Sequence, residues 1–381
     1  MDLSVHKPVT ILSGENCVTD RADLFAGLGH RALIVSGRRS ADLCGAMSDV
    51  AAALASVGAS YVRYNVIPEN PPAPLCHEGG ALARAEGCDF VIGIGGGSAL
   101  DAAKAIAAYA ANPDCDVMDI FDDTKRTADG LPLVCIPTTS GTGSEVNRYS
   151  VLTVDGGARK KTFKASSAYA RYAFLSPKYT SSLDENYTVS TALDALAHSI
   201  ESYLSPKSTE VSERAALYAA RELWSILTTD RASDANGDGE RDSGGYTALC
   251  RERLQNAACA AGIAIDYTGT GFPHPLGYSL TLTYGIPHGR ACAIFEGAYI
   301  RYNMLSSAGE ERILRLAEEL ETTPDELAER IPEMSGLLDM KLDTEERERL
   351  INLVADAGNY ANSPYVITRG EMSDIYTRLF E

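Results

Sequence analysis

The chain has 381 residues, of which 45% are hydrophobic and 23% are charged, and its formal net charge is -18. This length is too great for one ordinary hydrophobic core, so two domains of roughly 150–200 residues are expected. The composition is typical of a globular protein and excludes a disordered one. The negative charge argues against nucleic acid or an anionic membrane as a partner, although a local basic spot could still hold a nucleotide phosphate.

Nine cysteines are scattered along the chain without a C-x-x-C pair. This distribution argues against a disulfide framework and against a cysteine zinc site, and it is typical of reduced thiols. The N-terminal segment lacks the apolar core of a signal peptide, and no stretch approaches the roughly 18 apolar residues of a membrane span. We therefore expect a cytoplasmic protein.

Short apolar runs alternate with helical stretches through the first half of the chain. Strands are predicted at 32–36, 60–66, 89–95 and 131–137, helices at 41–57, 74–86 and 98–111, and a hairpin with a further strand within 150–177. The strands are rich in β-branched residues and almost continuously apolar. Their alternation with helices indicates a parallel α/β sheet, which we assign to an N-terminal domain of residues 1–182.

The sequence pattern changes near Asp184. Helices are predicted at 189–204, 209–228, 246–265, 310–321, 324–331, 344–357 and 370–380, and no convincing strand is found among them. Residues 183–381 are therefore predicted to form a helical domain, with the linker near 176–186. The segment 234–245 begins like a calcium loop, but Gly245 replaces the bidentate Glu, which favours a surface turn.

GIGGGSALDAAK (93–104) joins a strand to a helix through four glycines. Backbone N–H groups of such a turn, together with the following helix N-terminus, bind phosphate. Ser98 is predicted as the N-cap and Asp101 as the third helical residue. The strict G-x-G-x-x-G fingerprint is not met, because Ser98 stands where the third glycine belongs. A tight turn that needs small residues only for its backbone is the alternative.

Two further segments follow predicted strands. PTTSGTGSE (137–145) is rich in small hydrogen-bond donors and should share one sheet edge with the glycine loop, which points to a crevice for an anionic ligand. In SGRRS, Gly37 leaves room and Arg38 and Arg39 supply charge for a ribose 2′-phosphate, where an acidic residue would bind a free 2′-hydroxyl. A solvated basic turn is an equally good explanation.

The chain has only six histidines, and three of them are candidate metal ligands. DALAHSIE places Asp194 and His198 one helical turn apart on one face. His274 and His288 stand in Gly- and Pro-flanked segments. One carboxylate and three imidazoles suit a divalent metal and leave positions open for a substrate oxygen. Alone, an Asp-x-x-x-His pair on a helix is more often structural or exposed to solvent. Glu201 could contact one of the metal ligands, but helix capping or solvent exposure explains this residue better.

Together these motifs resemble the iron-containing (group III) alcohol dehydrogenase family. The matching stretches are GGGSALDAAKAIA (95–107), PTTSGTGSEV (137–146), DALAHSIESY (194–203), HPLGYSLTLTYGIPHG (274–289) and NSPYVITRGEMSDIY (362–376). The resemblance covers essentially the whole chain. It implies a Rossmann-like α/β N-terminal dinucleotide-binding domain with a parallel sheet, an all-α C-terminal domain, and a metal site in the cleft between them.

The resemblance also implies residue roles. The metal would be held by Asp194, His198, His274 and His288. The cofactor would be held by Gly95, Gly96, Gly97, Ser98, Thr138, Thr139 and Thr142, with Asp101 and Ser144 of the same motifs. Members that prefer NAD tend to carry Asp where Gly37 stands, so Gly37 beside Arg38 and Arg39 favours NADP. Many members carry a further histidine where this chain has Tyr278, so Tyr278 or water would replace it in a proton relay.

The implied activity is metal-dependent hydride transfer between a small alcohol or aldehyde and NAD(P). NADP(H) is preferred over NAD(H), Fe2+ is the expected metal, and the ligand set also accepts Zn2+, Mn2+, Co2+ or Ni2+. Family members are commonly dimers or larger, so a homo-oligomer is expected. Two alternatives stay open. One is an enzyme similar to glycerol dehydrogenase or dehydroquinate synthase, using Lys160, Lys161, Lys164 and Arg148 around a phosphorylated substrate. The other is a non-catalytic nucleotide-binding protein.

Overall fold

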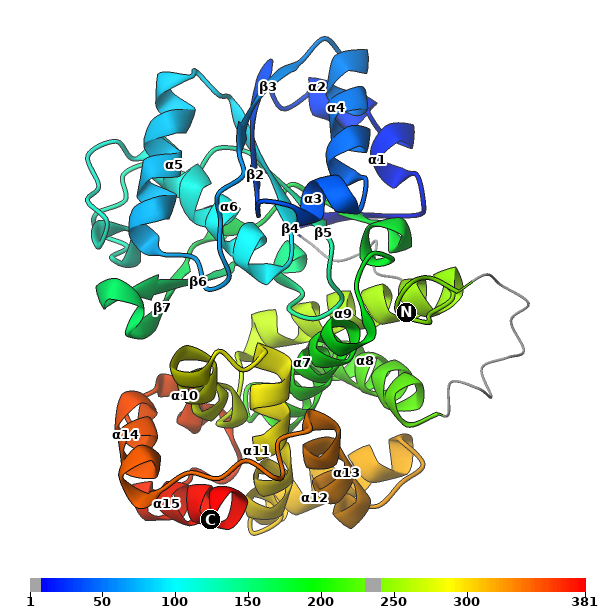
Figure 1. Ribbon diagram of the computed structural model, residues 1–381, viewed down its shortest axis with the longest axis vertical. Coiled ribbons are helices and arrows are strands. Elements are labelled where there is room, and N and C mark those ends of the chain that lie inside the picture. Colours follow the sequence, from blue (N-terminus) through cyan, green and yellow to red (C-terminus); the bar gives the residue numbers. More distant parts are fainter. Residues whose placement is uncertain (1–7, 230–240) are drawn as a thin grey trace. The chain divides into compact units, whose positions relative to one another are not determined.

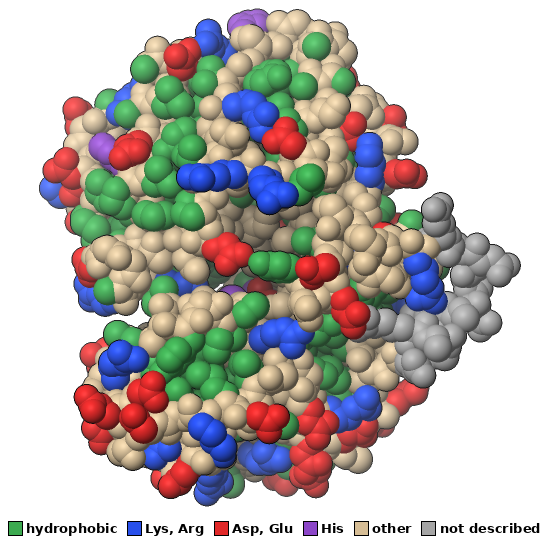
Figure 2. Space-filling model, viewed as in Figure 1, with side chains coloured by type: hydrophobic (Ala, Val, Ile, Leu, Met, Phe, Trp, Pro, Cys, Tyr) green, Lys and Arg blue, Asp and Glu red, His purple; other side chains and the backbone are tan. Residues whose placement is uncertain are grey.

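The chain divides into two compact units in the computed structural model, which describes all residues except 1–7 and 230–240. Among the described residues, the N-terminal unit comprises 8–184 and 241–259, and the C-terminal unit comprises 185–229 and 260–381. Each unit has its own architecture (Figure 1). Acidic and basic side chains are interspersed over the face shown in Figure 2, so the net negative charge is not gathered into one patch there.

The N-terminal unit is built on a six-stranded parallel sheet with the strand order β1-β8-β5-β4-β2-β3. The strands are β1 (Thr10–Ser13), β2 (Arg31–Ser36), β3 (Ser60–Tyr64), β4 (Phe90–Gly95), β5 (Leu133–Pro137) and β8 (Tyr172–Leu175). The central strands β4 and β5 are buried along their whole length, as continuous apolar runs in a parallel sheet should be. The predicted parallel α/β fold is confirmed.

Helices cover both faces of this sheet (Figure 1). One face carries α1 (Cys17–Asp20), α2 (Asp23–Ala26), α3 (Ser40–Leu43) and α4 (Ala46–Ser56), and the other carries α5 (Ala73–Ala85) and α6 (Gly97–Ala111). On the first face, Phe25 stacks on Phe174 with ring centroids 5.6 Å apart. The alanines of α6 are small enough for this helix to lie directly on β4 and β5.

Two details of the N-terminal unit differ from the sequence predictions. The edge strand β1 was not predicted, because its four residues are too short for a recognisable pattern. The predicted helix at 41–57 is two helices, since Gly45 adopts a left-handed conformation with φ of 82° between α3 and α4. The predicted hairpin is present as β6 (Tyr149–Val154) and β7 (Arg159–Lys164), which form a separate two-stranded antiparallel sheet.

The C-terminal unit consists of helices in its described part. They are α7 (Glu185–Leu204), α8 (Glu210–Thr228), α10 (Pro273–Tyr284), α11 (His288–Asn303), α12 (Ser307–Glu319), α13 (Pro324–Ser335), α14 (Thr344–Val354) and α15 (Arg369–Phe380), and α9 (Ala248–Thr268) contributes residues to both units. Helix α11 packs against α7, α10 and α13. The predicted all-α domain is therefore confirmed. No described helix is long and apolar enough to cross a membrane.

Helices α10 and α11 were not predicted from the sequence, because proline and glycine flank both segments. Pro273 occupies the first turn of α10, where its missing N–H costs no hydrogen bond, and Pro287 precedes α11. Gly285 ends α10 with a positive φ of 67°. These residues set the boundaries of two helices, of which α11 begins at His288 and α10 begins one residue before His274.

The segment 234–245, which was predicted to be a surface turn, falls mostly outside the described residues. In the part that is described, Asp242 Oδ1 accepts hydrogen bonds from the N–H groups of Gly244 and Tyr246, and Oδ2 accepts one from Arg251 Nε at 2.6 Å. Asp242 therefore forms a turn tied to α9.

Candidate metal centre and cofactor loops

Three helices of the C-terminal unit bring the four predicted metal ligands together. Helix α7 supplies Asp194 and His198 at positions one turn apart, α10 supplies His274, and α11 begins with His288. Asp194 Oδ1 lies 3.8 Å from Nε2 of His198, 3.6 Å from Nε2 of His274 and 3.8 Å from Nε2 of His288. One carboxylate oxygen thus stands among three imidazole nitrogens.

The close approach of α11 to α7 depends on Gly289. A Cβ at this position would lie 1.8 Å from Ser190 O and 2.8 Å from Asp194 N, both backbone atoms of α7. Because helix backbones cannot give way as a flexible side chain can, only glycine fits here. Gly289 therefore lets His288 stand beside Asp194.

Glu201 contacts the predicted metal ligand His274 and does not cap a helix. Its side chain is fully buried, its Oε1 lies 2.6 Å from His274 Nδ1, and its Oε2 accepts the Gly271 N–H at 2.5 Å. The sequence-based preference for capping or exposure was wrong. With Nδ1–H donating to Glu201, His274 presents the lone pair of Nε2 toward Asp194, the tautomer that a metal-binding histidine needs.

A second carboxyl group is buried behind Glu201. Glu296 on α11 is fully buried, and neither of its carboxyl oxygens has a hydrogen-bond partner among the described residues. Burial and the adjacent Glu201 carboxylate raise the pKa of Glu296 well above its usual value. The raised pKa favours the protonated form of Glu296, whose O–H could be donated to Glu201. Glu296 was not predicted as a site residue, because α11 was not predicted as a helix.

The ring of Tyr278 lies at the same site. It stacks on His288 with centroids 5.2 Å apart and meets His274 edge-on at 6.4 Å. His198 and His274 are themselves stacked at 4.5 Å. Tyr278 thus lies against two predicted metal ligands, at the position where many members of the resembling family carry a histidine.

Electrostatics at the site favour a bound cation. Burial alone would raise the pKa of Asp194, but His198, His274 and His288 hold it well below its usual range. Burial likewise disfavours a charged imidazole at His274, yet Glu201 and Asp194 raise its pKa to about 9. The buried carboxyl groups of Asp194 and Glu201 are therefore stabilised by nearby positive charge, which either protons on the imidazoles or a metal ion can supply.

The residues present fit a divalent metal. Asp194 Oδ1 and His274 Nε2 are buried and have no hydrogen-bond partner in the described part of the chain. A carboxylate with neutral imidazoles is a donor set for Fe2+, Zn2+ and related ions. An ion among these atoms would satisfy groups that the protein itself leaves unsatisfied.

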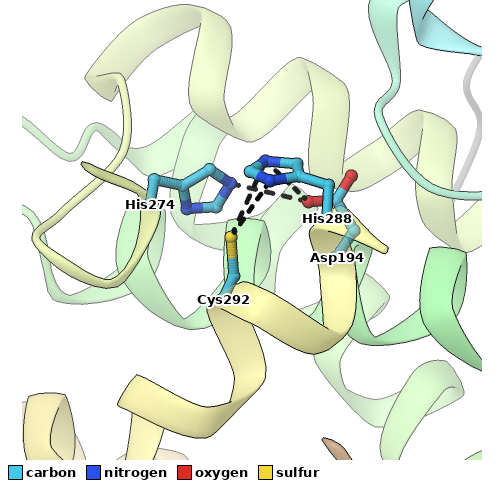
Figure 3. Close-up of side chains that lie close together, drawn as sticks. All are labelled: Asp194, His274, His288 and Cys292. Atoms are coloured by element: carbon cyan, nitrogen blue, oxygen red, sulfur yellow. Dashed lines mark hydrogen bonds and ion pairs between the residues drawn. The ribbon is translucent and has the colours of Figure 1, made fainter. Parts of the chain in front are cut away.

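Cys292 was not predicted as a site residue, but its side chain lies beside the candidate metal ligand His288. It follows His288 by one turn of α11, and its Sγ lies 3.6 Å from His288 Nε2. Figure 3 shows its sulfur directed toward Asp194, His274 and His288. A helix prediction starting at His288 would have revealed it, since residues four apart share a helix face.

In the N-terminal unit, the two small-residue loops begin side by side. Gly95 pairs with Pro137 where β4 and β5 end, and the Thr138 N–H donates to Gly95 O at 2.9 Å. Both loops therefore leave the same edge of the sheet, as predicted, and this is where α/β folds bind nucleotides.

The glycines of the first loop pack against threonines of the second. A Cβ at Gly96 would lie 3.1 Å from Thr139 Cγ2, and one at Gly97 would lie 2.6 Å from Thr142 Cγ2. All four residues are partly exposed. Their backbone N–H groups and hydroxyls are thus available at one place, and their cofactor role stays a prediction.

Other predicted cofactor residues make hydrogen bonds within the fold. Helix α6 begins at Gly97 with Gly96 as its N-cap, so Ser98 is not the N-cap, and its hydroxyl accepts the Asn70 N–H at 3.1 Å. Asp101 Oδ2 accepts the Val151 N–H at 2.9 Å. These bonds tie the helix to its neighbours.

Lys104 of the glycine-loop motif is a buried cation for which no role was predicted. Its Nζ donates to Ser144 Oγ at 2.7 Å, to Asn147 Oδ1 at 3.2 Å and to Tyr149 O at 2.6 Å. Ser144 in turn donates to Asp101 Oδ1 at 2.6 Å. Asp101 and Ser144 thus hold the second loop in position from behind.

The basic turn after β2 is open to solvent. Arg38 and Arg39 are exposed, and Gly37 is partly buried. The basic residues considered for a phosphorylated substrate lie elsewhere in this unit: Lys164 and Arg148 line an open depression of about 560 Å3 with Arg126.

Comparison with known proteins identifies relatives along the whole chain. The family described as "Iron-containing alcohol dehydrogenase" matches residues 8–177, and "Fe-containing alcohol dehydrogenase family, C-terminal" matches residues 188–380. Long-chain-alcohol dehydrogenase 1 of Geobacillus thermodenitrificans is 36% identical over 63% of this chain and 59% of its own length. The chain spans 27% to 63% of the length of the first four curated relatives.

Solved structures share the whole fold. An iron-containing alcohol dehydrogenase from Thermotoga maritima is 31% identical with a TM-score of 0.87, and the match covers 98% of both chains. Sulfoacetaldehyde reductase from Bifidobacterium kashiwanohense, solved in complex with NAD+, is 26% identical with a TM-score of 0.84 over 98% of this chain and 97% of its own.

Proposed function

Because the chain belongs to the iron-containing alcohol dehydrogenase family, we propose that it is a metal-dependent, NAD(P)-linked oxidoreductase that interconverts a small alcohol and its aldehyde. The observation that carries this proposal is the convergence of one carboxylate oxygen, of Asp194, with the imidazoles of His198, His274 and His288. The nicotinamide of the cofactor accepts or gives the hydride, as its own chemistry provides.

The protein groups prepare the metal site for a substrate oxygen. A divalent ion held there would draw electron density from that oxygen, which eases proton loss from an alcohol and polarises an aldehyde carbonyl. Glu201 fixes the tautomer of His274, and burial of Asp194 keeps competing water from its carboxylate. Tyr278, stacked on His288, is proposed to carry the phenolic O–H that exchanges the proton with solvent.

The loops of the N-terminal unit are proposed to bind the cofactor phosphates. Gly96 and Gly97 would supply backbone N–H groups, and Thr139 and Thr142 would supply hydroxyls from the facing loop. Arg38 and Arg39 would neutralise a ribose 2′-phosphate, which favours NADP over NAD. A homo-oligomer is proposed on the basis of family resemblance alone.

Anaerobic assay tests the proposal. Purified protein loaded with Fe2+ should oxidise NADPH in the presence of at least one member of a panel of short and long aldehydes, and chelation followed by metal replacement should abolish and restore the rate. The His274→Ala variant is the matched inactive control. Absence of metal-dependent NADPH or NADH oxidation across the panel would refute the proposal. Substrate turnover that leaves the cofactor unchanged in net amount would favour the dehydroquinate synthase-like alternative.

A further inference from the structure

One buried side chain joins the two proposed cofactor loops. Helix α6 begins in the first loop at Gly97 and carries Lys104 roughly two turns further along. The Lys104 side chain is fully buried, and its Nζ donates to Ser144 Oγ at 2.7 Å, to Asn147 Oδ1 at 3.2 Å and to Tyr149 O at 2.6 Å. Ser144 belongs to the second loop, and the other two acceptors lie just after it, where β6 begins.

The ammonium group of Lys104 is used entirely within the protein. Its three acceptors match its three N–H donors, so none is left for a bound ligand. Asp101 Oδ1 lies 3.8 Å from Lys104 Nζ and accepts the Ser144 hydroxyl at 2.6 Å. The two buried charges compensate each other, and both groups hold the Ser144 hydroxyl in place.

Ser144 in turn orients the hydroxyl of Thr142. The Ser144 N–H donates to Thr142 Oγ1 at 3.2 Å. A Cβ at Gly97 would lie 3.0 Å from the same Thr142 oxygen, so this hydroxyl stands beside the N-terminus of α6. Because Thr142 Oγ1 accepts from Ser144, its own O–H is directed away and is available to a phosphate oxygen bound at this helix end.

Asn147 holds the turn that presents Thr142. Gly143, between Thr142 and Ser144, adopts a left-handed conformation with φ of 58°. Its carbonyl oxygen accepts the Asn147 Nδ2–H at 2.9 Å, and Asn147 Oδ1 accepts from Lys104. Lys104 therefore acts on both residues that follow Thr142, on one through Asn147 and on the other directly.

We propose that Lys104 is a positioning residue for the cofactor, whose ammonium group acts through Ser144 to orient the Thr142 hydroxyl toward a phosphate of the nicotinamide nucleotide. The inference rests on the proposed function, which assigns that nucleotide to the two loops. Since Lys104 has no donor left for a ligand, its removal weakens nucleotide binding by releasing Thr142 from its preorganised position, and not by deleting a direct contact.

Nucleotide titration of the full-length, metal-loaded protein tests the proposal. Lys104→Met keeps the length of the side chain and removes the charge and the donors. Its Kd for NADPH or NADH, whichever the wild type binds more tightly, should rise at least about tenfold in a fluorescence titration. In the aldehyde assay the change should appear in the KM for that nucleotide, while kcat stays within about twofold. Lys341→Met, which removes an exposed lysine of the C-terminal unit, is the control and should leave the Kd unchanged.

A double-mutant cycle separates positioning from a general structural role. Thr142→Val removes the hydroxyl, keeps the shape of the side chain, and should weaken nucleotide binding by itself. Adding Lys104→Met to Thr142→Val should then cost less than about twofold more, because the group that Lys104 positions is already absent. If Lys104→Met does not fold, Ser144→Ala takes its place in the cycle with the same expectation, since it deletes the hydroxyl through which Lys104 acts.

The outcomes distinguish this inference from the proposed function. Losses of affinity that multiply in the double variant overturn the positioning role and leave the proposed function intact. An unchanged Kd in Lys104→Met, in its substitute Ser144→Ala or in Thr142→Val does the same. Wild-type protein that binds neither NADPH nor NADH overturns the cofactor role of the loops, and the positioning role with it.

Discussion

Glu201 shows how much a single residue decides at this site. Its two oxygens are both used, one by His274 Nδ1 and the other by the Gly271 N–H. The carboxylate therefore sets both the tautomer and the ring orientation of a predicted metal ligand. Burial and the neighbouring Glu201 carboxylate raise the pKa of Glu296, which favours its protonated form behind Glu201. The order of contacts runs from Glu296 through Glu201 to His274.

Gly37 is proposed to set cofactor preference. A Cβ there would lie 3.5 Å from Ile67 O and 3.6 Å from Ser40 Oγ, so a side chain fits without strain. In Gly37→Asp the new carboxylate should repel a 2′-phosphate and accept hydrogen bonds from a free ribose, lowering kcat/KM for NADPH at least tenfold relative to NADH. Gly37→Ala is the control for added volume. An unchanged NADPH/NADH ratio in Gly37→Asp would exclude this turn from the cofactor site.

At the scale of elements, the N-terminal ends of α10 and α11 position two of the candidate metal ligands. Both α10 and α11 begin at or beside a histidine, and Gly289 permits α11 to touch the backbone of α7. Motif spacing in the sequence predicted Asp194, His198, His274 and His288 correctly as a group that comes together. It could not predict Cys292, whose position depends on α11 being a helix.

The Gly289→Ala substitution tests this packing. The added methyl group would overlap Ser190 O, so α11 must shift away from α7, at a cost of about 3 kcal/mol in the free energy of unfolding. The affinity for metal should fall by at least tenfold, because His288 moves with the helix. Urea unfolding and metal titration measure the two effects. Gly358→Ala, where a Cβ meets nothing within 4 Å, is the control, and equal behaviour of both variants would refute the argument.

Two other features, the contact of Glu201 and the break between α3 and α4, could not be predicted from the sequence for physical reasons. Glu201 follows His198 by three residues, a spacing compatible with a cap, with exposure or with the observed buried contact. Only the tertiary position of His274 decides among these. Likewise the break between α3 and α4 depends on the positive φ of Gly45, and a glycine in a helical pattern does not reveal its φ.

At the scale of the whole molecule, the two units divide the proposed chemistry. The proposed phosphate loops lie in the N-terminal unit and all the candidate metal ligands lie in the C-terminal unit. Hydride transfer as proposed needs groups from both. The alternation of strands and helices predicted the first unit and the helical period predicted the second, whereas the expected cleft between them stays a prediction.

The stability of the molecule should depend on Glu145. This carboxyl group is buried near Lys104, Cys135 and Cys259, and burial raises its pKa to about 7 although Lys104 opposes the shift. Between about pH 4.5 and pH 7 the folded state keeps a proton that the unfolded state has released, so the free energy of unfolding decreases as pH rises through this window. The decrease is about 3 kcal/mol and is complete above pH 7.

The Glu145→Gln variant should remove this dependence. Urea unfolding of metal-free protein at pH 5, 6, 7 and 8 should show a smaller loss of stability with rising pH in the variant than in the wild type, and a more stable variant at pH 8. The exposed residue Glu69, changed to Gln, serves as control. Parallel curves for wild type and Glu145→Gln would show that the buried carboxyl does not titrate in this range.

Metal content measures the central claim most directly. Protein purified without oxygen, stripped with a chelator and reloaded with Fe2+ or Zn2+ should contain one metal ion per chain by elemental analysis. His274→Ala should retain less than a tenth of an equivalent after the same treatment while unfolding at a comparable urea concentration. Wild-type protein that is folded yet cannot be loaded, or a His274→Ala variant that binds one equivalent with unchanged affinity, would contradict the account.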